Sequence, residues 1–517
     1  MIEEIPASIV YPKDRFFLDY LADPPRLSPF FSGRGLREAA EVRATLRYPR
    51  ADLADSLAVY NASIGGSKET EAGIEELRHD ETLCVMTGQQ AGFLGGPVYT
   101  LYKILSCIRL AGRLRESLGV PVVPIFWLAS EDHDFTEINR CRLVDSDGSL
   151  RTVSFDWDRR GRSIEELPIT EEVMQAAEEV LDRFPDSKRT LRSMFLFQDG
   201  DDYAGWHSRI WSRLFADDGL ILVEPRVVRP LGGGFFEAAF RDYARIKAEM
   251  HGAAERLKAL GYEPPLDPER AGRPFLLDRP EGRTRVAKPE EQAGRARDNP
   301  DRYSADAALR PILVDSLFPT VAHVLGPGEI AYHAMLLPLY RLFRLPPPGI
   351  VPRHGYTLIS AEEEDLLRRL GIPVTEAMRI GPDTKATLRR AASPALRSEF
   401  EKAYERLNQA TAPLLPILAE LDPGLKGSWR RATDRAVREV RGLEERAVRA
   451  ELARRGISAR KVHALLSSLR PGGRPQERVL SFVHFVQRFG VEWIHTLPGG
   501  EEPERFAHYV VTIEGER

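Results

Sequence analysis

TLCVMTGQQAGFLGGPVYTLYK, residues 82–103, is the stretch that decides the fold of this 517-residue chain. Its first five residues form a short, mostly apolar run typical of a buried strand. Pro97 suits the first turn of a helix, which we expect to continue to about Leu118. Residues 120–128 (VPVVPIFWL) predict a second strand. Strand, helix and strand form a βαβ unit, whose crossover should be right-handed.

A second unit of this kind lies far downstream. It consists of a strand, a tight loop, a helix and a second strand, at residues 320–325, 326–329, 330–343 and 349–352. Residues 34–80 predict helix, residues 216–225 predict a further strand, and the broken, proline-rich region of roughly 145–315 is typical of inserted subdomains. Strands alternating with helices predict the α/β class with a mainly parallel sheet.

From about Ser393 the chain becomes charged and helical. We predict a core of residues 1–385, a long helical hairpin of residues 386–457, and a C-terminal segment, 458–517, that ends in a strand and returns to the core. The second hairpin helix carries apolar residues at coiled-coil spacing, namely Leu425, Trp429, Ala432, Ala436, Val440, Leu443, Ala447 and Ala450. This seam indicates packing inside the hairpin or pairing with a second chain, and we expect a homodimer.

Composition narrows the class of protein. Charged residues make up 29% of the chain but nearly balance, with a formal net charge of −4, which argues against a nucleic-acid or membrane-surface binder. The three cysteines, Cys84, Cys107 and Cys141, form no CxxC pair and suggest a reducing compartment. Neither a signal peptide nor a spanning apolar stretch is found. We therefore expect a cytoplasmic protein.

The loop after the first strand is the first candidate binding site. Ligands of parallel sheets bind beyond the carboxyl ends of the strands. Glycines allow backbone N–H groups to approach a ligand, the helix start favours an anion, and amide side chains add hydrogen bonds without charge. The candidates are Gly88, Gln89, Gln90, Gly92, Gly95, Gly96, Tyr99 and Lys103. The alternative is that Gly95 and Gly96 only allow tight packing between strand and helix.

The second strand ends in Glu131, Asp132, His133 and Asp134, three carboxylates and an imidazole in four positions. Such crowding is unfavourable unless a metal or an ammonium group lies nearby. The cluster could serve as a general base, coordinate Mg²⁺ or recognise an amino group. The alternative is a strand end followed by a helix cap at Asp134 or Thr136.

A third loop, Gly326-Pro327-Gly328-Glu329, follows a strand of the second unit and is either a binding loop or a simple turn. Arg353, just after the last strand, is a candidate clamp for an anion because its planar fork suits carboxylate or phosphate. His333 is expected to serve packing. Neither the phosphate-binding GxxxxGK[ST] motif nor the dinucleotide GxGxxG motif is present at the first loop.

These residues resemble a known family, the cysteine-adding enzymes of bacillithiol biosynthesis. The matching stretches run in collinear order over nearly the whole chain, at residues 16–31, 87–103, 124–140, 217–226, 310–334, 351–359 and 476–485. The TGQQAG, SEDHDF and GPGEIAY blocks are specific to the family. His323 and His333 stand where we expect Tyr and Trp in relatives, so the pocket wall should differ here.

The resemblance implies a Rossmann-like core with inserted connecting-peptide subdomains and a helical coiled coil that pairs two subunits. The implied activity joins L-cysteine to the amine of glucosaminyl-malate, with ATP expected and Mg²⁺ possible. The HIGH and KMSKS signatures of class I synthetases are absent, so an adenylate mechanism is an analogy. The alternatives are a nucleotidyltransferase-like enzyme that activates another small carboxylate, or a nucleotide-sensing dimeric scaffold.

Under this resemblance the loop backbone and Lys103 would stabilise the charged transition state. His133 or a neighbouring carboxylate would take a proton from the attacking ammonium. Glu131, Asp132 or Asp134 would hold Mg²⁺ or the ammonium of cysteine, and no cysteine pair is present to hold zinc.

Overall fold

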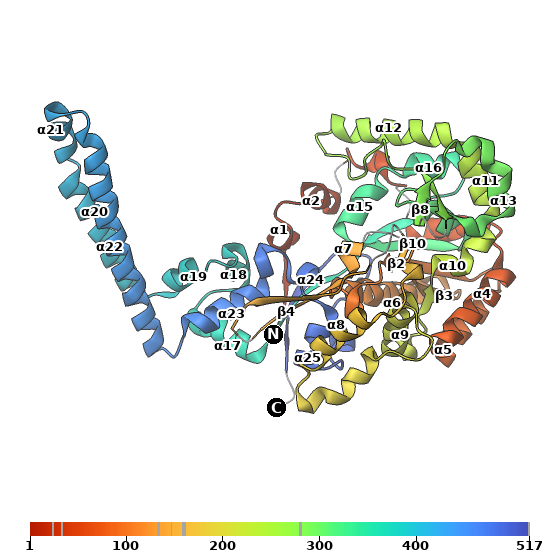
Figure 1. The fold of residues 1–517 in the computed structure, drawn as a ribbon, viewed down its shortest axis with the longest axis horizontal. Coiled ribbons are helices and arrows are strands. Elements are labelled where there is room, and N and C mark those ends of the chain that lie inside the picture. Colours follow the sequence, from red (N-terminus) through yellow and green to blue (C-terminus); the bar gives the residue numbers. More distant parts are fainter. Residues whose placement is uncertain are drawn as a thin grey trace.

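The computed structural model describes residues 1–22, 25–32, 35–131, 135–145, 147–157, 162–278 and 282–514. Five strands form the central sheet of the body in Figure 1, in the order β11-β10-β2-β3-β6, and each neighbouring pair is parallel. Their bounds are Leu83–Gln89 (β2), Val122–Leu128 (β3), Ile221–Val223 (β6), Thr320–Leu325 (β10) and Gly349–Pro352 (β11). The predicted α/β class is confirmed.

Both faces of this sheet are buried. Along β3, Phe126 and Leu128 pack in the same core as helix α6 (Tyr99–Leu118), whereas Ile125 and Trp127 pack in a second core. The alternation follows from the two-residue period of a strand. Covering helices on both faces explain why the strands read as nearly continuous apolar runs.

Helix α6 connects β2 to β3 as predicted, but its first turn is covered. It begins at Tyr99, and the segment before helix α25 (Phe482–Phe489) lies against its start. The N–H of Val98 donates to the carbonyl of Leu480 at 2.9 Å, and the N–H of Phe482 donates to the carbonyl of Gly96 at 2.8 Å. The helix start, predicted to face an anion, therefore faces the protein's own backbone.

The second unit has the predicted strands, but its helix is two short helices, α15 (Pro327–His333) and α16 (Leu337–Leu342). Since β10 lies beside β2 and runs parallel to it, the loops after both strands meet at one edge of the sheet. The predicted helical stretch 34–80 is likewise three helices, with bounds Leu36–Ala44 (α3), Arg50–Ser63 (α4) and Lys68–Glu76 (α5).

The C-terminal strand is present as predicted, but the other short strands outside the central sheet were not predicted from the sequence. β1 (Ile2–Ile5) pairs antiparallel with β13 (His508–Ile513), which runs parallel to β12 (Gly355–Ser360), so the C-terminal strand lies between two strands distant in sequence. β4 (Arg140–Val144) and β5 (Leu150–Ser154) form a hairpin. Strands β7 to β9 form a small sheet in the middle region, at Pro274–Asp278, Gly282–Arg285 and Tyr303–Ala305.

The helical hairpin projects from the body (Figure 1) and consists of α20 (Pro394–Thr411), α21 (Leu414–Leu421) and α22 (Leu425–Arg454). The predicted seam divides in two. Trp429 is partly buried and its Nε1 donates to the carbonyl of Thr411 at 2.9 Å. Leu443, by contrast, is 53% exposed. The three-four spacing therefore describes two adjacent faces of α22, of which only one packs inside the hairpin.

The three cysteines are buried and free, and burial raises the pKa of each thiol, so the expected absence of a disulfide framework is consistent with their placement. Within the described residues, every helix is too short or too polar to cross a membrane.

Candidate functional site

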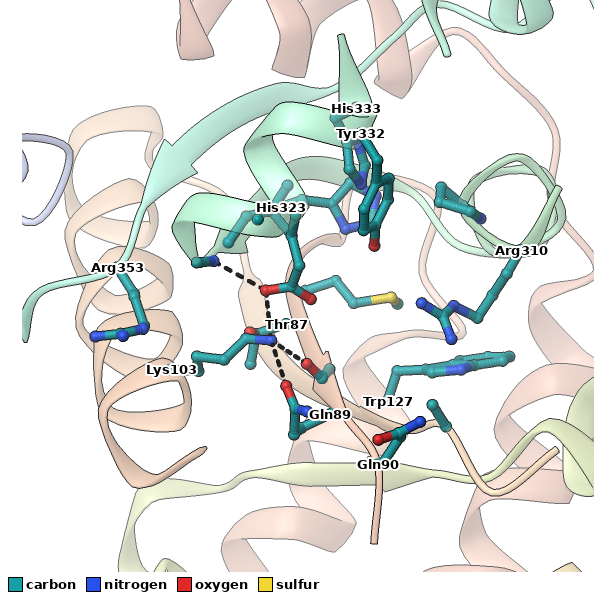
Figure 2. A pocket seen from close by; sticks show the side chains of 18 of the residues that line it. Thr87, Gln89, Gln90, Lys103, Trp127, Arg310, His323, Tyr332, His333 and Arg353 are labelled. Carbon is teal, nitrogen blue, oxygen red and sulfur yellow. Dashed lines mark hydrogen bonds and ion pairs between the residues drawn. The ribbon is translucent and has the colours of Figure 1, made fainter. Parts of the chain in front are cut away.

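A cavity of about 340 Å³ opens at the carboxyl ends of β2, β10 and β11 (Figure 2). It gathers predicted residues from both units: Gly88, Gln89, Gln90, Tyr99, Lys103, Gly326, Gly328, Glu329 and Arg353. The wall is rich in cations, and Glu329 is the one carboxylate among its described residues. These residues were predicted to bind a ligand, and the structure places them around one cavity. The contacts described below change the role of several of them.

Lys103 joins the two loops. Its side chain is 1% exposed, and its Nζ lies 2.6 Å from Oε2 of Glu329 and 3.1 Å from Oε1 of Gln89. It also donates to the carbonyl of Gly88. Burial lowers the pKa of Lys103, although Glu329 opposes this shift. An ammonium has three donors, and all three are used here, so Lys103 positions the loops instead of contacting a ligand as predicted.

Arg353 lines the cavity, but its fork is occupied. The guanidinium nitrogen atoms lie 2.6 and 2.9 Å from the two carboxylate oxygens of Glu477, and both side chains are almost fully buried. Burial alone would raise the pKa of Glu477, but Arg353 outweighs it and lowers the pKa. The predicted clamp for a ligand's anion is therefore corrected, because Arg353 clamps a carboxylate of the protein itself.

The glycines of the first loop divide into two groups. Gly88 lines the cavity, whereas Gly92, Gly95 and Gly96 do not. A Cβ on Gly95, whose φ is +87°, would lie 2.8 Å from Cδ1 of Phe482, and a Cβ on Gly92 would lie 2.5 Å from Cα of Gly96. For Gly95 and Gly96, the alternative of tight packing explains the glycines without a ligand, whereas Gly92 also lines a smaller neighbouring cavity.

The acidic cluster is described only in part. Asp132, His133 and Asp134 lie outside the described residues, so their predicted roles stay predictions. Glu131 is 2% exposed, its carboxylate forms no hydrogen bond within the described residues, and Nη2 of Arg229 lies at 3.8 Å. Burial raises its pKa, and it is not in the cavity wall. In the described part of the chain, no three His, Cys, Asp or Glu side chains converge as metal ligands do.

The resemblance pointed to His323 and His333 as part of the pocket wall, but Tyr332, Trp127 and Arg310 were missed. Figure 2 shows His323, Tyr332 and His333 on one side of the cavity and Trp127 and Arg310 on another. Burial and the neighbouring His323 hold the pKa of His333 well below its usual range.

Behind this wall, Nε2 of His323 lies 3.0 and 3.1 Å from the carboxylate oxygens of Asp315, which also accepts from the hydroxyl of Tyr340 at 2.5 Å. Burial alone would raise the pKa of Asp315, but His323 and Arg43 lower it, so this carboxylate is charged. In a neutral imidazole this contact places the proton on Nε2, and Nδ1 is then the acceptor. In the sequence, an Asp inside the apolar run of residues 311–317 was the one feature that could have indicated this buried pair.

The fold and the cavity define a class: α/β proteins with a Rossmann-like core and a small, cation-lined cavity where parallel strands end. Comparison with protein families shows which family of this class the chain belongs to. The model "Bacillithiol biosynthesis BshC, N-terminal Rossmann-like domain" matches residues 2–354, and "Bacillithiol biosynthesis BshC, C-terminal coiled-coil domain" matches residues 356–513. The chain belongs to the BshC family of bacillithiol biosynthesis.

Curated relatives agree. The protein named "Putative cysteine ligase BshC" from Geobacillus thermodenitrificans is 31% identical over 499 residues, which cover 91% of each chain. Its namesake from Geobacillus kaustophilus is 31% identical over 493 residues, 90% of each chain. The protein of the same name from Koribacter versatilis is 29% identical over an alignment 540 positions long, which covers 98% of this chain and 99% of the relative.

Proposed function

We propose that this protein is a ligase that joins the carboxyl group of L-cysteine to the amine of glucosaminyl-malate in an ATP-linked reaction. The observation that carries the proposal is the cation-lined cavity at the strand ends of a chain that belongs to the BshC family. The names of the relatives support the ligase class and cysteine as the acid component.

In this reaction an amide bond forms between the sugar nitrogen and the carboxyl carbon of cysteine. One carboxylate oxygen leaves on a phosphoryl or adenylyl group, and the ammonium of the sugar loses two protons. Glu329 has a role in holding cysteine: Lys103 and the N–H of Gly326 bind its Oε2, and Oε1 forms no hydrogen bond within the described residues. That oxygen is suited to the ammonium group of an amino acid.

Two imidazoles are candidates for the proton acceptor. His133 is the one that the sequence suggests, and it lies outside the described residues. His323 lines the cavity, and Asp315 fixes its tautomer so that Nδ1 can accept a proton. Exchange of either general base should lower turnover by about 10²–10⁴-fold. His323→Asn and His133→Asn therefore identify the base, and His323→Tyr, which restores the residue expected in relatives, separates proton transfer from a wall role.

ATP is supported by the chemistry, because a free carboxylate does not react with an amine at neutral pH. The cationic wall fits its phosphates in charge, and Arg310 on α14 (Arg310–Leu317) would contribute to holding them. Mg²⁺ stays a proposal for Asp132 and Asp134, and raised Mg²⁺ should partly rescue their Asn variants but not His133→Asn.

We also propose a homodimer through the helical hairpin, in a cytoplasmic enzyme. α21 leaves large apolar side chains exposed at helical spacing, at Leu414, Ile417 and Leu421, and Leu443 of α22 is exposed too. Clusters of large exposed apolar side chains are typical of interaction surfaces. The same side chains on the hairpin of a second copy would pack against them.

The test is incubation of the purified protein with glucosaminyl-malate, L-cysteine and ATP, read by mass spectrometry for the cysteinyl product. Release of ADP or of pyrophosphate identifies the activation step. An adenylylated acid released without amide would indicate the nucleotidyltransferase alternative. Nucleotide binding without any turnover would indicate the scaffold.

A further inference from the structure

A second, smaller cavity adjoins the main one. Its volume is about 220 Å³, and it shares Gln89, Gln90, Tyr99 and Arg478 with the main cavity. Four arginines line it, and we call it the arginine chamber: Arg140, Arg142, Arg474 and Arg478. Among the described residues, no carboxylate lines this chamber.

Two distant parts of the chain bring these arginines together. Arg140 and Arg142 alternate with buried Cys141 and Leu143 along β4, so both lie on the same, half-exposed face. The N–H of Arg142 donates to Oγ of Ser481 at 3.0 Å, and the N–H of Ser481 donates back to the carbonyl of Arg142 at 3.0 Å. These bonds fix β4 beside the segment that carries the other two arginines.

The positive charge of the chamber is not neutralised within the described structure. None of the four arginines forms an ion pair with a described carboxylate, and the side-chain partner of Arg140 is the neutral amide of Asn139, at 3.3 Å. Burial, followed by repulsion from Arg140 and Arg474, lowers the pKa of Arg142. Like charges this close are unfavourable by themselves, and a bound anion would relieve the repulsion.

The chamber offers side-chain donors in place of the backbone N–H groups that phosphate loops use. Phosphate loops use free backbone N–H groups, but here the N–H of Gly92 donates to Gln90, that of Gly96 to Phe93, and that of Val98 to Leu480. The donors that remain are side chains, and the guanidinium forks among them suit a carboxylate as well as a phosphate, so the choice of a carboxylate follows from the chemistry of the proposed amine substrate.

We propose that the arginine chamber binds the dicarboxylate end of the amine substrate. The two malyl carboxylates lie among the guanidinium groups. The glucosamine part extends past the residues that both cavities share, so that its nitrogen lies in the main cavity. This proposal rests on the proposed function for the identity of the amine.

The test compares Arg142→Gln and Arg478→Gln with a surface control, Arg113→Gln, whose side chain is 54% exposed on α6. Loss of a charge-assisted hydrogen bond should raise KM for glucosaminyl-malate roughly 10- to 100-fold. KM for ATP and cysteine should not change, nor should kcat/KM for methyl glucosaminide, which lacks the carboxylates. Arg142→Lys, which keeps the charge but not the fork, should recover part of the affinity.

Calorimetry with L-malate needs no turnover and separates this inference from the ligase assignment. We expect the wild type and Arg113→Gln to bind L-malate and the chamber variants to bind it weakly. A wild type that binds L-malate through the chamber but makes no amide supports the chamber and contradicts the ligase. Chamber variants that raise KM for ATP instead assign the chamber to nucleotide and overturn the proposal, as do variants that change neither KM nor malate affinity.

Discussion

Two sets of cations lie side by side at the end of the central sheet, and they differ in what neutralises them. Lys103 and Arg353 are buried and contact Glu329 and Glu477, so the ammonium of Lys103 and the two Nη atoms of Arg353 are used inside the protein. The four chamber arginines are more exposed and have no described carboxylate in their wall. The difference teaches that a cation at a strand end indicates a ligand site only when no carboxylate of the protein itself is paired with it.

Removing Arg353 should have the largest effect on stability. Arg353→Met leaves the fully buried Glu477 without its partner, which typically costs about 3–5 kcal/mol. Urea unfolding measures this loss, and Arg353→Met with Glu477→Leu should recover much of it, because an apolar pair needs no compensation. Intact stability with lost ligand affinity would restore the ligand clamp that the sequence suggested.

Buried histidines differ from both sets of cations. Burial keeps their imidazoles uncharged, so they need no anion as a partner. His207 contacts the carbonyl of Gly92 at 2.9 Å and accepts from Nε1 of Trp211 at 2.9 Å, and burial lowers its pKa to about 4. Burial likewise lowers the pKa of His508 to about 4.

Between an unfolded pKa of about 6.5 and the folded value, the unfolded chain binds more protons. The free energy of unfolding should therefore be highest above about pH 6.5 and fall toward pH 4, by on the order of 1 kcal/mol per pH unit for each group. His207→Gln should flatten this slope in thermal or urea unfolding, and the exposed His79→Gln is the control. An unchanged slope would show that His207 does not couple to folding.

The first loop allows a similar comparison between its two halves. Gly95→Val forces a branched side chain into a positive φ and against Phe482, which should cost about 1–3 kcal/mol. Ligand affinity of the folded protein should stay near that of the wild type, as measured by calorimetry below the unfolding temperature. A stable variant that no longer binds ligand would mean that this half of the loop contacts ligand after all.

The hairpin variants should have the smallest effect on the stability of the core. Leu443→Asp places a charge on the exposed face of α22 and should give a monomer by light scattering. Val440→Asp lies on the partly buried face and should loosen the hairpin itself, which circular dichroism can detect. A dimer that survives Leu443→Asp would show that this face is not the interface.

The parallel sheet could be predicted from short stretches of the sequence, because the apolar runs and the glycine-rich turns between them are local signals. It also located Gly88, Gln89 and Glu329 at the cavity, since the first two end one parallel strand and Glu329 lies in the first turn of the helix after another. It could not assign Gly95 or Arg353, because their partners, Phe482 and Glu477, are far away in the chain.

The arginine chamber was out of reach for the same physical reason. Its charges come from β4 and from the segment before α25. Arg140 and Arg478 lie in stretches that match the family, but nothing in either stretch shows that the two meet. The Asp315–His323 pair joins a helix to a strand, and only the charge inside an apolar run hinted at it.

The most direct test of the distinction between paired and unpaired cations measures Arg353→Met and Arg142→Gln in the same two assays, urea unfolding and L-malate calorimetry. The contacts predict opposite outcomes. Arg353→Met should lose about 3–5 kcal/mol of stability, and Arg142→Gln should lose malate affinity while its unfolding free energy stays within about 0.5 kcal/mol of the wild type. Loss of malate affinity in Arg353→Met without loss of stability, or unfolding of Arg142→Gln with malate affinity intact, would contradict the distinction.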